Sequence, residues 1–452
     1  MVLPYSEGEL FMRTKAEILN LVEEEDVEFI RLQFTDMFGT LKNVAVTASQ
    51  LEQVINKKYV FDGSSMYGNL RRGEEDMFLC PDLDTFVILP WRPQQGKVAR
   101  LLCDVCRADG TPLAVSSREI LRKTVKKADD LGYTFYVDPE CEFFLFHTDE
   151  NGIPTTVTHE EAGYMDISPL DLGENARREI VLTLEEMGFE IESSHHEGAP
   201  AQHEIDFVYA EAMETADKIV TFKNAVRSTA KRFGLHATFM PKPRAGAAGS
   251  GMHLNISLFK DGKNLFSDPE SPDGLSQEAK WFMGGVMAHA RAMCAVTNPL
   301  VNSYKRLNSG FEAPRDIIWT TRNQNTLIRV PVLRQEDTRI ELRFPDPASN
   351  PYLTLTVCLA AGLDGIERKI DPGAEAAFRF EERTQEEKTL AGIAHLPETL
   401  YEAVSIMEQD SFMKNVLGGD FVQLYTNAKK AEWNEYMSQV SEWEVEKYLY
   451  RT

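Results

Sequence analysis

Four strand-like segments of this chain place ionisable side chains at alternate positions, and this pattern constrains the fold more than any other feature. They are TFYVDPECEFFLF (134–146), HEIDFVYA (203–210), GMHLNISLF (251–259) and TRIELRFPD (338–346). Successive side chains of a strand point to opposite faces of a sheet, so the polar ones share one face and the apolar ones face a core. Helical stretches separate the segments, which predicts an α+β fold with a large sheet.

Acidic residues gather in the first two segments and in the turn before the second. Glu140 and Glu142 are two residues apart, so a strand would present both carboxylates on one face. Glu197 and Glu204 lie on either side of a Gly-Ala-Pro turn, which allows both to reach one point. Carboxylates this close repel one another unless a cation lies between them. Three histidines are adjacent, and we interpret most of them as supporting residues: His195, His196 and His203.

The third and fourth segments add imidazole, amide and guanidinium groups to this set. The polar residues that alternate with apolar ones are His253, Asn255, Ser257, Arg339, Glu341 and Arg343. Five carboxylates and one imidazole, from the four segments and the turn before the second, predict two hard divalent cations, Mg²⁺ or Mn²⁺. Paired cations with arginines beside them are typical of phosphoryl transfer, because charge on the moving group must be stabilised.

A glycine-rich segment, KPRAGAAGSGMH (242–253), leads into the third strand-like run. It is not a Walker A loop, because no GK[ST] follows. Glycines let a ligand approach backbone N–H groups closely, although a plain flexible hairpin would have a similar composition.

Composition and charge exclude several classes of partner. The formal net charge of −23 argues against nucleic acid, since an acidic surface repels phosphate backbones. No apolar run approaches the ~20 residues that a membrane helix needs, and the N-terminus lacks the pattern of a secretory signal. We therefore expect a cytoplasmic protein with no membrane partner. The cysteines, including the lone Cys103/Cys106 pair, are interpreted as buried thiols rather than a zinc site.

The first ~110 residues predict a small mixed domain around a short sheet. A helix over 13–25 begins with a capping box, because Glu17 follows Thr14 by three residues. The predicted organisation is an extension (1–12), a small domain (13–112) and a catalytic domain (113–452). Further helices are expected at 116–131, 174–187, 212–233, 275–297, 350–370 and within 398–448.

Nine ordered motifs match a known pattern. They are FDGSS (61–65), DPECEFF (138–144), HHEGAPAQHEIDF (195–207), MPKP (240–243), GSGMH (249–253), NSYKRL (302–307), GFEAP (310–314), LIRVP (327–331) and RIELRFPDPASNPYL (339–353). The chain thereby resembles the bacterial type I glutamine synthetases. The absence of Tyr from 376–389 places it with the branch that is not adenylylated. The resemblance implies a β-grasp-like N-terminal domain, a catalytic domain with a curved antiparallel sheet, and a dodecamer with active sites between subunits.

The resemblance also implies roles for individual residues. One metal would be held by Glu142, Glu197 and Glu204, and the other by Glu140, His253 and Glu341. Residues matching ATP contacts are Glu192, Tyr209, Ser257, Arg329 and Arg339. Residues matching glutamate contacts are Gly249, Arg306, Glu312 and Arg343. The catalytic set would be Asp62, Glu312, Arg329 and Arg343, with Asp62 or Glu312 taking a proton from ammonium. ATP would phosphorylate the γ-carboxylate of glutamate, and ammonia would then displace phosphate.

Three sites, four positions in all, depart from the family pattern. Ala248 replaces an Asn that helps to hold glutamate, Gln324 replaces an Arg that faces the transferred phosphate, and Asn308-Ser309 replaces Val-Pro. Arg322 lies two residues from Gln324 and could substitute on a strand. Two alternatives therefore stay open: a γ-glutamyl ligase that uses another amine, and a catalytically weak regulatory or structural homologue.

Overall fold

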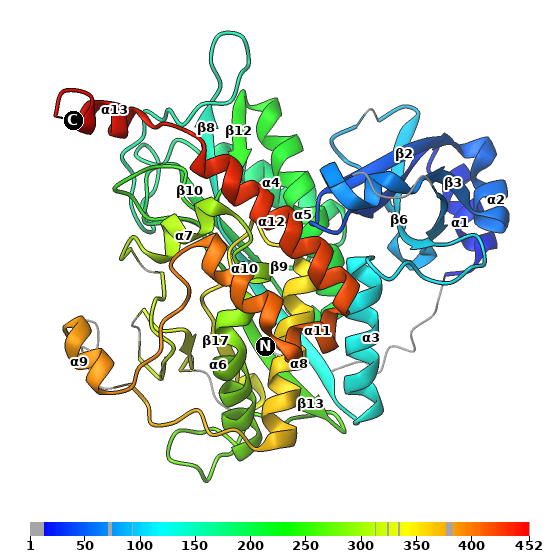
Figure 1. The fold of residues 1–452 in the computed structure, drawn as a ribbon. Helices are drawn as coiled ribbons and strands as arrows, with labels where there is room; N and C mark the ends of the chain where they lie inside the picture. The colour runs from blue at the N-terminus through cyan, green and yellow to red at the C-terminus, as the bar shows by residue number, and fades with distance from the viewer. Residues whose placement is uncertain are drawn as a thin grey trace. The chain divides into compact units, whose positions relative to one another are not determined.

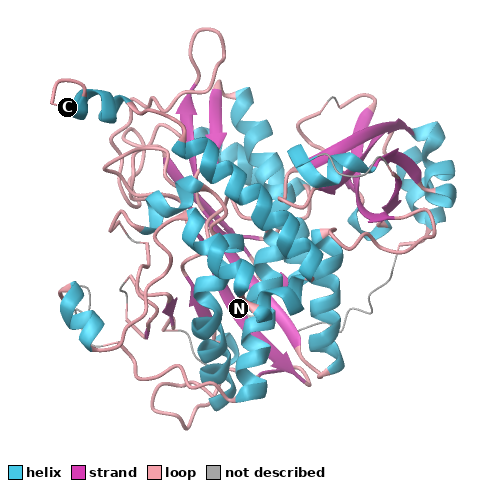
Figure 2. Ribbon diagram, in the orientation of Figure 1, coloured by secondary structure: helices cyan, strands magenta, loops and turns pink. Residues whose placement is uncertain are grey.

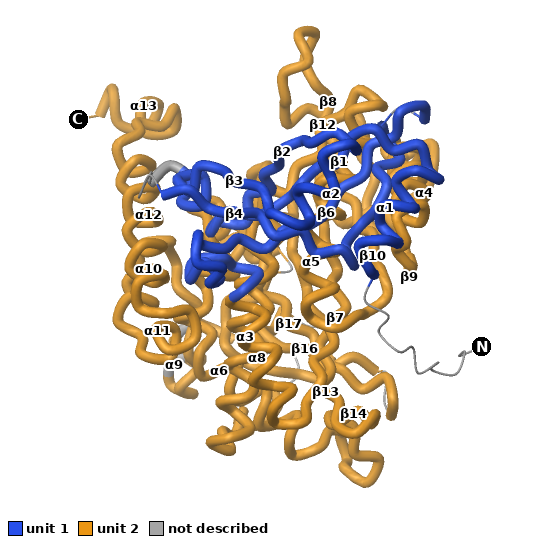
Figure 3. Tube along the Cα trace, turned by 90° about the vertical axis from the view of Figure 1, so that its right-hand side faces the viewer, with its two compact units in different colours: residues 1–119 blue, residues 120–452 orange. Residues whose placement is uncertain are grey.

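The computed structural model describes residues 13–70, 75–92, 94–311, 313–322, 325–332, 335–376 and 383–451. The chain divides into two compact units, Met1–Glu119 and Ile120–Thr452 (Figure 3). Both units combine helices with strands (Figure 2).

The first unit is built on a six-stranded sheet in the order β2-β1-β6-β4-β3, with β5 paired to β6. Strands β1 and β6 are parallel, and the other pairs are antiparallel. The predicted capping box of α1 is present, since Thr14 and Glu17 bond each other's backbone N–H groups. The elements are α1 (Lys15–Glu24), β1 (Val27–Thr35), β2 (Leu41–Thr47), α2 (Ala48–Lys57), β3 (Tyr59–Asp62), β4 (Asp76–Pro81), β5 (Val87–Ile88), β6 (Lys97–Cys106) and the start of α3 (Ser117–Asp130).

The second unit contains an eleven-stranded sheet with helices packed on it (Figure 1). Its strands are β7 (Thr134–Cys141), β8 (Phe143–His147), β9 (Ile191–His196), β10 (Gln202–Phe207), β11 (Ala210–Glu211), β12 (Leu235–Thr238), β13 (Met252–Lys260), β14 (Lys263–Asn264), β15 (Trp319–Thr320), β16 (Ile328–Arg329) and β17 (Ile340–Leu342). Its helices after α3 are α4 (Glu174–Glu186), α5 (Ala212–Arg232), α6 (Gln277–Thr297), α7 (Val301–Leu307), α8 (Pro351–Arg368), α9 (Gln385–Leu390), α10 (Leu400–Gln409), α11 (Ser411–Leu417), α12 (Gly419–Met437) and α13 (Glu442–Tyr448).

The strand order brings the four polar segments together. The main path is β12-β8-β10-β7-β13-β17-β16-β15, so β10, β7, β13 and β17 are consecutive neighbours. All pairs along this path are antiparallel except β15 with β16. The register places His253 opposite Glu140 and Asn255 opposite Glu341. Residues from distant parts of the sequence thereby meet on one face.

Helices α6 and α8 pack closely beneath this sheet. A Cβ atom on Gly285 would lie 2.0 Å from the carbonyl oxygen of Ala361, and one on Gly365 would lie 2.1 Å from that of Trp281. No side chain fits in so small a space, so glycine at both positions lets the two backbones touch.

One expectation about element boundaries is wrong in detail. The run 134–146 forms two strands, because β7 pairs with β13 whereas β8 pairs with β12, and Glu142 lies at the break. The C-terminal stretch 398–448 is helical, as predicted, and forms the four helices α10 to α13. Asp410 caps α11 and Ser441 caps α13, while Gly418, at φ 90°, separates α11 from α12.

Among the residues that the structure describes, no helix is both long and apolar enough to cross a bilayer.

Candidate metal and nucleotide site

A first group of possible metal ligands spans three neighbouring strands. Glu140 (β7), His253 (β13) and Glu341 (β17) each offer an atom within 4.8 Å of the others. The imidazole Nδ1 of His253 lies 3.2 Å from Glu140 Oε2 and 3.6 Å from Glu341 Oε1. This is the group that the resemblance implied for one metal.

Cationic and amide groups hold the carboxylates of the first group in place. Arg329 donates to Glu341, and Arg343 Nε lies 3.3 Å from Glu341 Oε1. Asn255 donates its side-chain amide to Glu140 at 2.7 Å. Burial would raise the pKa of Glu140, but the hydrogen bond and charge of His253 outweigh it and lower the pKa to about 2. Glu140 is therefore ionised, as a metal ligand must be.

A second group lies on the β9–β10 hairpin. His195, Glu197 and Glu204 have ligand atoms within 4.8 Å of one another. Glu142 comes from the break between β7 and β8, where its backbone N–H bonds the Gly251 carbonyl. Its carboxylate accepts from Gln202 at 2.5 Å. The resemblance implied Glu142 for this group, whereas we interpreted His195 as a supporting residue. In the structure His195 has a ligand atom within 4.8 Å of both glutamates, and Glu142 interacts electrostatically with Glu197.

The second group carries more negative charge than its surroundings balance. Burial raises the pKa of Glu204 well above its usual value, and the nearby Asp206 and Glu142 carboxylates raise it further. Burial and the Glu197 carboxylate likewise raise the pKa of Glu142, to about 7, against the charges of His253 and Arg306. Among the described residues, the buried Oδ1 of Asp206 has no hydrogen-bond partner. Buried oxygens with surplus charge fit a hard divalent cation.

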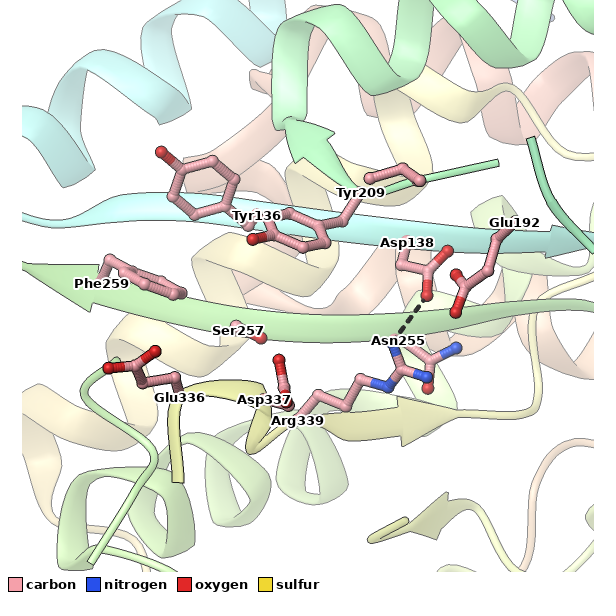
Figure 4. A pocket seen from close by; sticks show the side chains of 11 residues that line it. Tyr136, Asp138, Glu192, Tyr209, Asn255, Ser257, Phe259, Glu336, Asp337 and Arg339 are labelled. Atoms are coloured by element: carbon pink, nitrogen blue, oxygen red, sulfur yellow. Dashed lines mark hydrogen bonds and ion pairs between the residues drawn. The ribbon is translucent and has the colours of Figure 1, made fainter. Parts of the chain in front are cut away.

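A cavity of about 340 Å³ opens beside the first group (Figure 4). Its lining residues include Tyr136, Asp138, Glu192, Val208, Tyr209, Asn255, Ser257, Phe259, Glu336, Asp337 and Arg339. At one end the rings of Tyr136 and Tyr209 meet edge to face at 5.6 Å. At the other, Arg339 donates to Asp138 at 2.9 Å, the dashed contact in Figure 4.

The cavity and the first group form one continuous site. Asn255 lines the cavity and also bonds Glu140, so one side chain joins the two. One end of the cavity has aromatic rings, and the other has an arginine beside carboxylates. This combination suits a ligand with a ring and a phosphate chain. Glu192, Tyr209, Ser257 and Arg339, which the resemblance implied as ATP contacts, all line this cavity. Arg329 bonds Glu341 of the first group.

The glycine-rich segment is linked by hydrogen bonds to Glu142, beside the second group. A Cβ atom on Gly249 would lie 2.2 Å from the carbonyl oxygen of Pro241, so this position accepts only glycine. The Gly249 carbonyl accepts from Gln202, which also bonds Glu142. Arg306 is buried and donates to the backbone carbonyls of Arg343 and Phe344, so much of its hydrogen bonding is structural.

The sequence also singled out Asp62, Glu312 and Gln324. Asp62 is exposed at the end of β3 in the first unit, where it accepts from the backbone N–H of Ser64. Glu312 and Gln324 lie outside the described residues.

A buried ion-pair network behind the hairpin was not predicted. His196 Nε2 lies 2.9 Å from Glu160 Oε1, and its Nδ1 lies 2.7 Å from the Glu197 carbonyl oxygen. Burial opposes the charge of His196, but Glu160 outweighs it and raises the pKa. Arg177 bonds Asp171 and His203 in the same group. Its guanidinium already supplies the positive charge there, so we interpret the group as support for the hairpin rather than a metal site. Only the adjacency of two histidines to Glu197 could have indicated it.

The comparisons with known proteins agree with this geometry. Residues 26–108 match the model of the glutamine synthetase β-grasp domain, and residues 114–448 match the model of the glutamine synthetase catalytic domain. The chain belongs to the glutamine synthetase family. The family and the α+β fold class predicted from the sequence are thereby confirmed, and so, at the level of the family, is a glutamate–ammonia ligase.

Relatives cover almost the whole chain. A glutamine synthetase of Clostridium saccharobutylicum is 56% identical over 96% of this chain and 98% of its own length. One of Staphylococcus aureus is 52% identical over the same shares. Among solved structures, a GmaS–ADP complex superposes with a TM-score of 0.86 at 33% identity, covering 95% of this chain and 99% of that one. Ligand-free GmaS gives 0.84 at 32% identity, covering 96% and 99%.

The structure shows the surroundings of one residue that departs from the family pattern. Ala248, which replaces an Asn, packs with Ala247 against an apolar cluster that contains Phe144, Phe146, Ala199 and Ala201. The side chain at this position therefore contributes packing and no polar contact.

Proposed function

We propose that this chain makes glutamine from glutamate, ammonia and ATP, through a γ-glutamyl phosphate. The observation that carries the proposal is the continuity of the Glu140–His253–Glu341 group with the cavity lined by Tyr209, Ser257 and Arg339. A nucleotide in that cavity would direct its phosphates toward the carboxylates, where only a cation-bridged arrangement avoids repulsion.

Two divalent cations, Mg²⁺ or Mn²⁺, are proposed for the two groups. Glu140, His253 and Glu341 would hold one, and Glu142, Glu197 and Glu204, with His195 beside them, would hold the other. When bound, such ions neutralise phosphate charge and polarise phosphoryl oxygens. Oxygen-rich ligand sets favour these ions over softer metals.

The remaining site residues act on the substrates. Glu192, Tyr209, Ser257 and Arg339 would contact ATP, and Arg329 a phosphate. Gly249, Arg306 and Arg343 would bind glutamate. The charges of Arg329 and Arg343 favour phosphoryl transfer to the γ-carboxylate, because they oppose the charge that builds up there.

Deprotonation of ammonium is proposed for Asp62 and Glu312. A carboxylate beside ammonium binds the cation and then takes its proton, which frees the nitrogen lone pair to attack the acyl phosphate. Glu312 would also cover the intermediate, since water would otherwise hydrolyse it.

We further propose a cytoplasmic homo-oligomer, a dodecamer with Asp62 supplied to the site of a neighbouring subunit. The functional domains would be 13–112 and 113–452 after an extension of 1–12. Close relationship to bacterial glutamine synthetases supports this arrangement.

An acceptor screen tests the function. Purified protein with ATP, Mg²⁺ and glutamate should release phosphate when ammonium is added, and mass spectrometry should identify glutamine. Glu341→Gln should lower turnover by at least about 100-fold, because the first group loses a charged ligand and two arginines lose their partner. Glu367→Gln, on the exposed side of α8, is the matched control.

The same screen decides between the proposed function and its alternatives. Ala248 packs against an apolar cluster and cannot make the polar contact to the amino-acid substrate that an Asn would make. The screen therefore includes amines other than ammonia. Phosphate release only with methylamine, ethanolamine or a polyamine would identify a different γ-glutamyl ligase. No release with any acceptor, from a well-assembled protein, would identify a regulatory or structural homologue.

A further inference from the structure

Two cysteine thiols of the first unit face each other across neighbouring strands. Cys80 lies on β4 and Cys106 ends β6, and the strands are antiparallel, with Cys80 opposite Asp104 and Cys106 opposite Phe78. Residues two apart on a strand share a face, so both thiols lie on the same face as diagonal neighbours. The Cys80 thiol donates to Cys106, with 2.9 Å between the Sγ atoms.

We propose that Cys80 and Cys106 form a reversible disulfide when the protein meets a hydroperoxide. A disulfide bond is ~2.05 Å long, so the sulfurs must approach by less than ~1 Å. The two Sγ atoms already lie 2.9 Å apart on paired strands, so a small approach of the two side chains brings them to bonding distance. The inference is independent of the proposed function.

The two sulfurs differ in access, and this sets the order of the chemistry. Cys80 is half-buried, whereas Cys106 is 8% exposed. Burial, followed by the hydrogen bond from Cys80, raises the pKa of Cys106 to about 12. Cys80 is therefore the thiol that meets the oxidant, and Cys106 is the one that resolves the product.

The reaction balances with the peroxide as the only oxidant. The Cys80 sulfur attacks a peroxide oxygen, the O–O bond breaks, and Cys80 becomes a sulfenic acid while water or an alcohol leaves. The Cys106 sulfur then attacks the Cys80 sulfur and displaces hydroxide, which takes the Cys106 proton to form water. In total the two thiols lose two protons and two electrons, and the peroxide gains them.

The other cysteines lack this arrangement. Cys103 lies three residues from Cys106, so it points to the opposite face of β6, and its thiol is directed at the Leu101 carbonyl at 3.8 Å. Burial raises the pKa of Cys103 well above its usual value. Cys141, Cys294 and Cys358 are buried in the second unit.

Oxidation would cross-link two strands of the sheet that carries Asp62. β4 pairs with β6 on one side and with β3 on the other, where Asp76 lies opposite Asp62. A bond between residues 26 positions apart would tie β4 to β6 and restrict the unfolded chain.

Thiol counting and peptide mapping test the proposal on the full-length chain. The reduced protein is treated with hydrogen peroxide, denatured and alkylated. We expect free thiols to fall by two from the six present, one peptide pair joined through Cys80 and Cys106, and full recovery with dithiothreitol. Cys80→Ser and Cys106→Ser should each abolish the linked peptides, whereas Cys103→Ser should retain them.

Several outcomes would overturn the proposal. They are an unchanged thiol count, a Cys80 sulfinic or sulfonic acid without a linked peptide, or a link from Cys80 to Cys103. Circular dichroism of each reduced variant checks that the serine substitutions leave the fold intact, so a missing link is attributable to the missing thiol.

Discussion

The imidazole of His196 lies 2.9 Å from the carboxylate of Glu160, on the side of the β9–β10 hairpin opposite Glu197 and Glu204. Both ring nitrogens of His196 face acceptors, and the second acceptor is the carbonyl oxygen of Glu197 itself. Glu160 also accepts from the backbone N–H groups of Ala201 and Leu172. One buried carboxylate thereby fixes both ends of the turn that carries the second group.

Glu160→Gln should weaken divalent-metal binding by roughly 10- to 100-fold, since side chains that orient ligands contribute about that much affinity. The amide keeps the shape but loses the charge that holds His196. Titration with Mn²⁺, followed by electron paramagnetic resonance, measures the effect without turnover. Glu161→Gln, one residue along and exposed, should leave the affinity unchanged. Equal affinities for the two variants would contradict a supporting role for Glu160.

Arg339→Ala should weaken ADP binding by about 10- to 100-fold, because a hydrogen bond to a charged group contributes about 1.5–3 kcal/mol. The substitution also leaves Asp138, whose pKa burial raises to about 8, without its cationic partner. Isothermal titration calorimetry with ADP and Mg²⁺ measures the change. Arg368→Ala, on the exposed side of α8, is the control. An unchanged ADP affinity would remove the cavity from the nucleotide site.

Gly249→Ala should raise the KM for glutamate by about 10-fold or more, since overpacking costs ~1–3 kcal/mol. The new methyl group would meet the Pro241 carbonyl at 2.2 Å, so the backbone must move where glutamate is proposed to bind. Gly419→Ala, where a Cβ meets nothing within 4 Å, should have no effect. Steady-state kinetics with glutamate varied distinguishes the two. An unchanged KM would place glutamate elsewhere.

The stability of the protein should depend on Lys223 at alkaline pH. Burial lowers the pKa of Lys223 from its usual 10.5 to about 8. Between these values the unfolded chain holds a proton that the folded chain has lost, so the free energy of unfolding rises with pH there, by up to about 1.4 kcal/mol per pH unit. Lys223→Met should remove this rise, whereas Lys231→Met, exposed on the same helix, should keep it. Denaturant unfolding from pH 7.5 to 10.5 measures the slopes, and parallel profiles for wild type and Lys223→Met would refute the prediction.

The sequence by itself determined the family, the fold class and the polar face of each strand. Alternation is a local property, so the shared face of His253, Asn255 and Ser257 follows from spacing alone. The helices predicted at 174–187, 212–233 and 275–297 appear at Glu174–Glu186, Ala212–Arg232 and Gln277–Thr297, since helical periodicity is also local.

Only the tertiary structure decided which side chains meet. Sheet register places His253 opposite Glu140, and register depends on pairing between segments more than a hundred residues apart. The Glu160–His196 pair, the cavity beside Asn255 and the contact between Cys80 and Cys106 all join positions that no local pattern relates. Local spacing sets the direction of a side chain, but its neighbours are set by the packing of the whole unit.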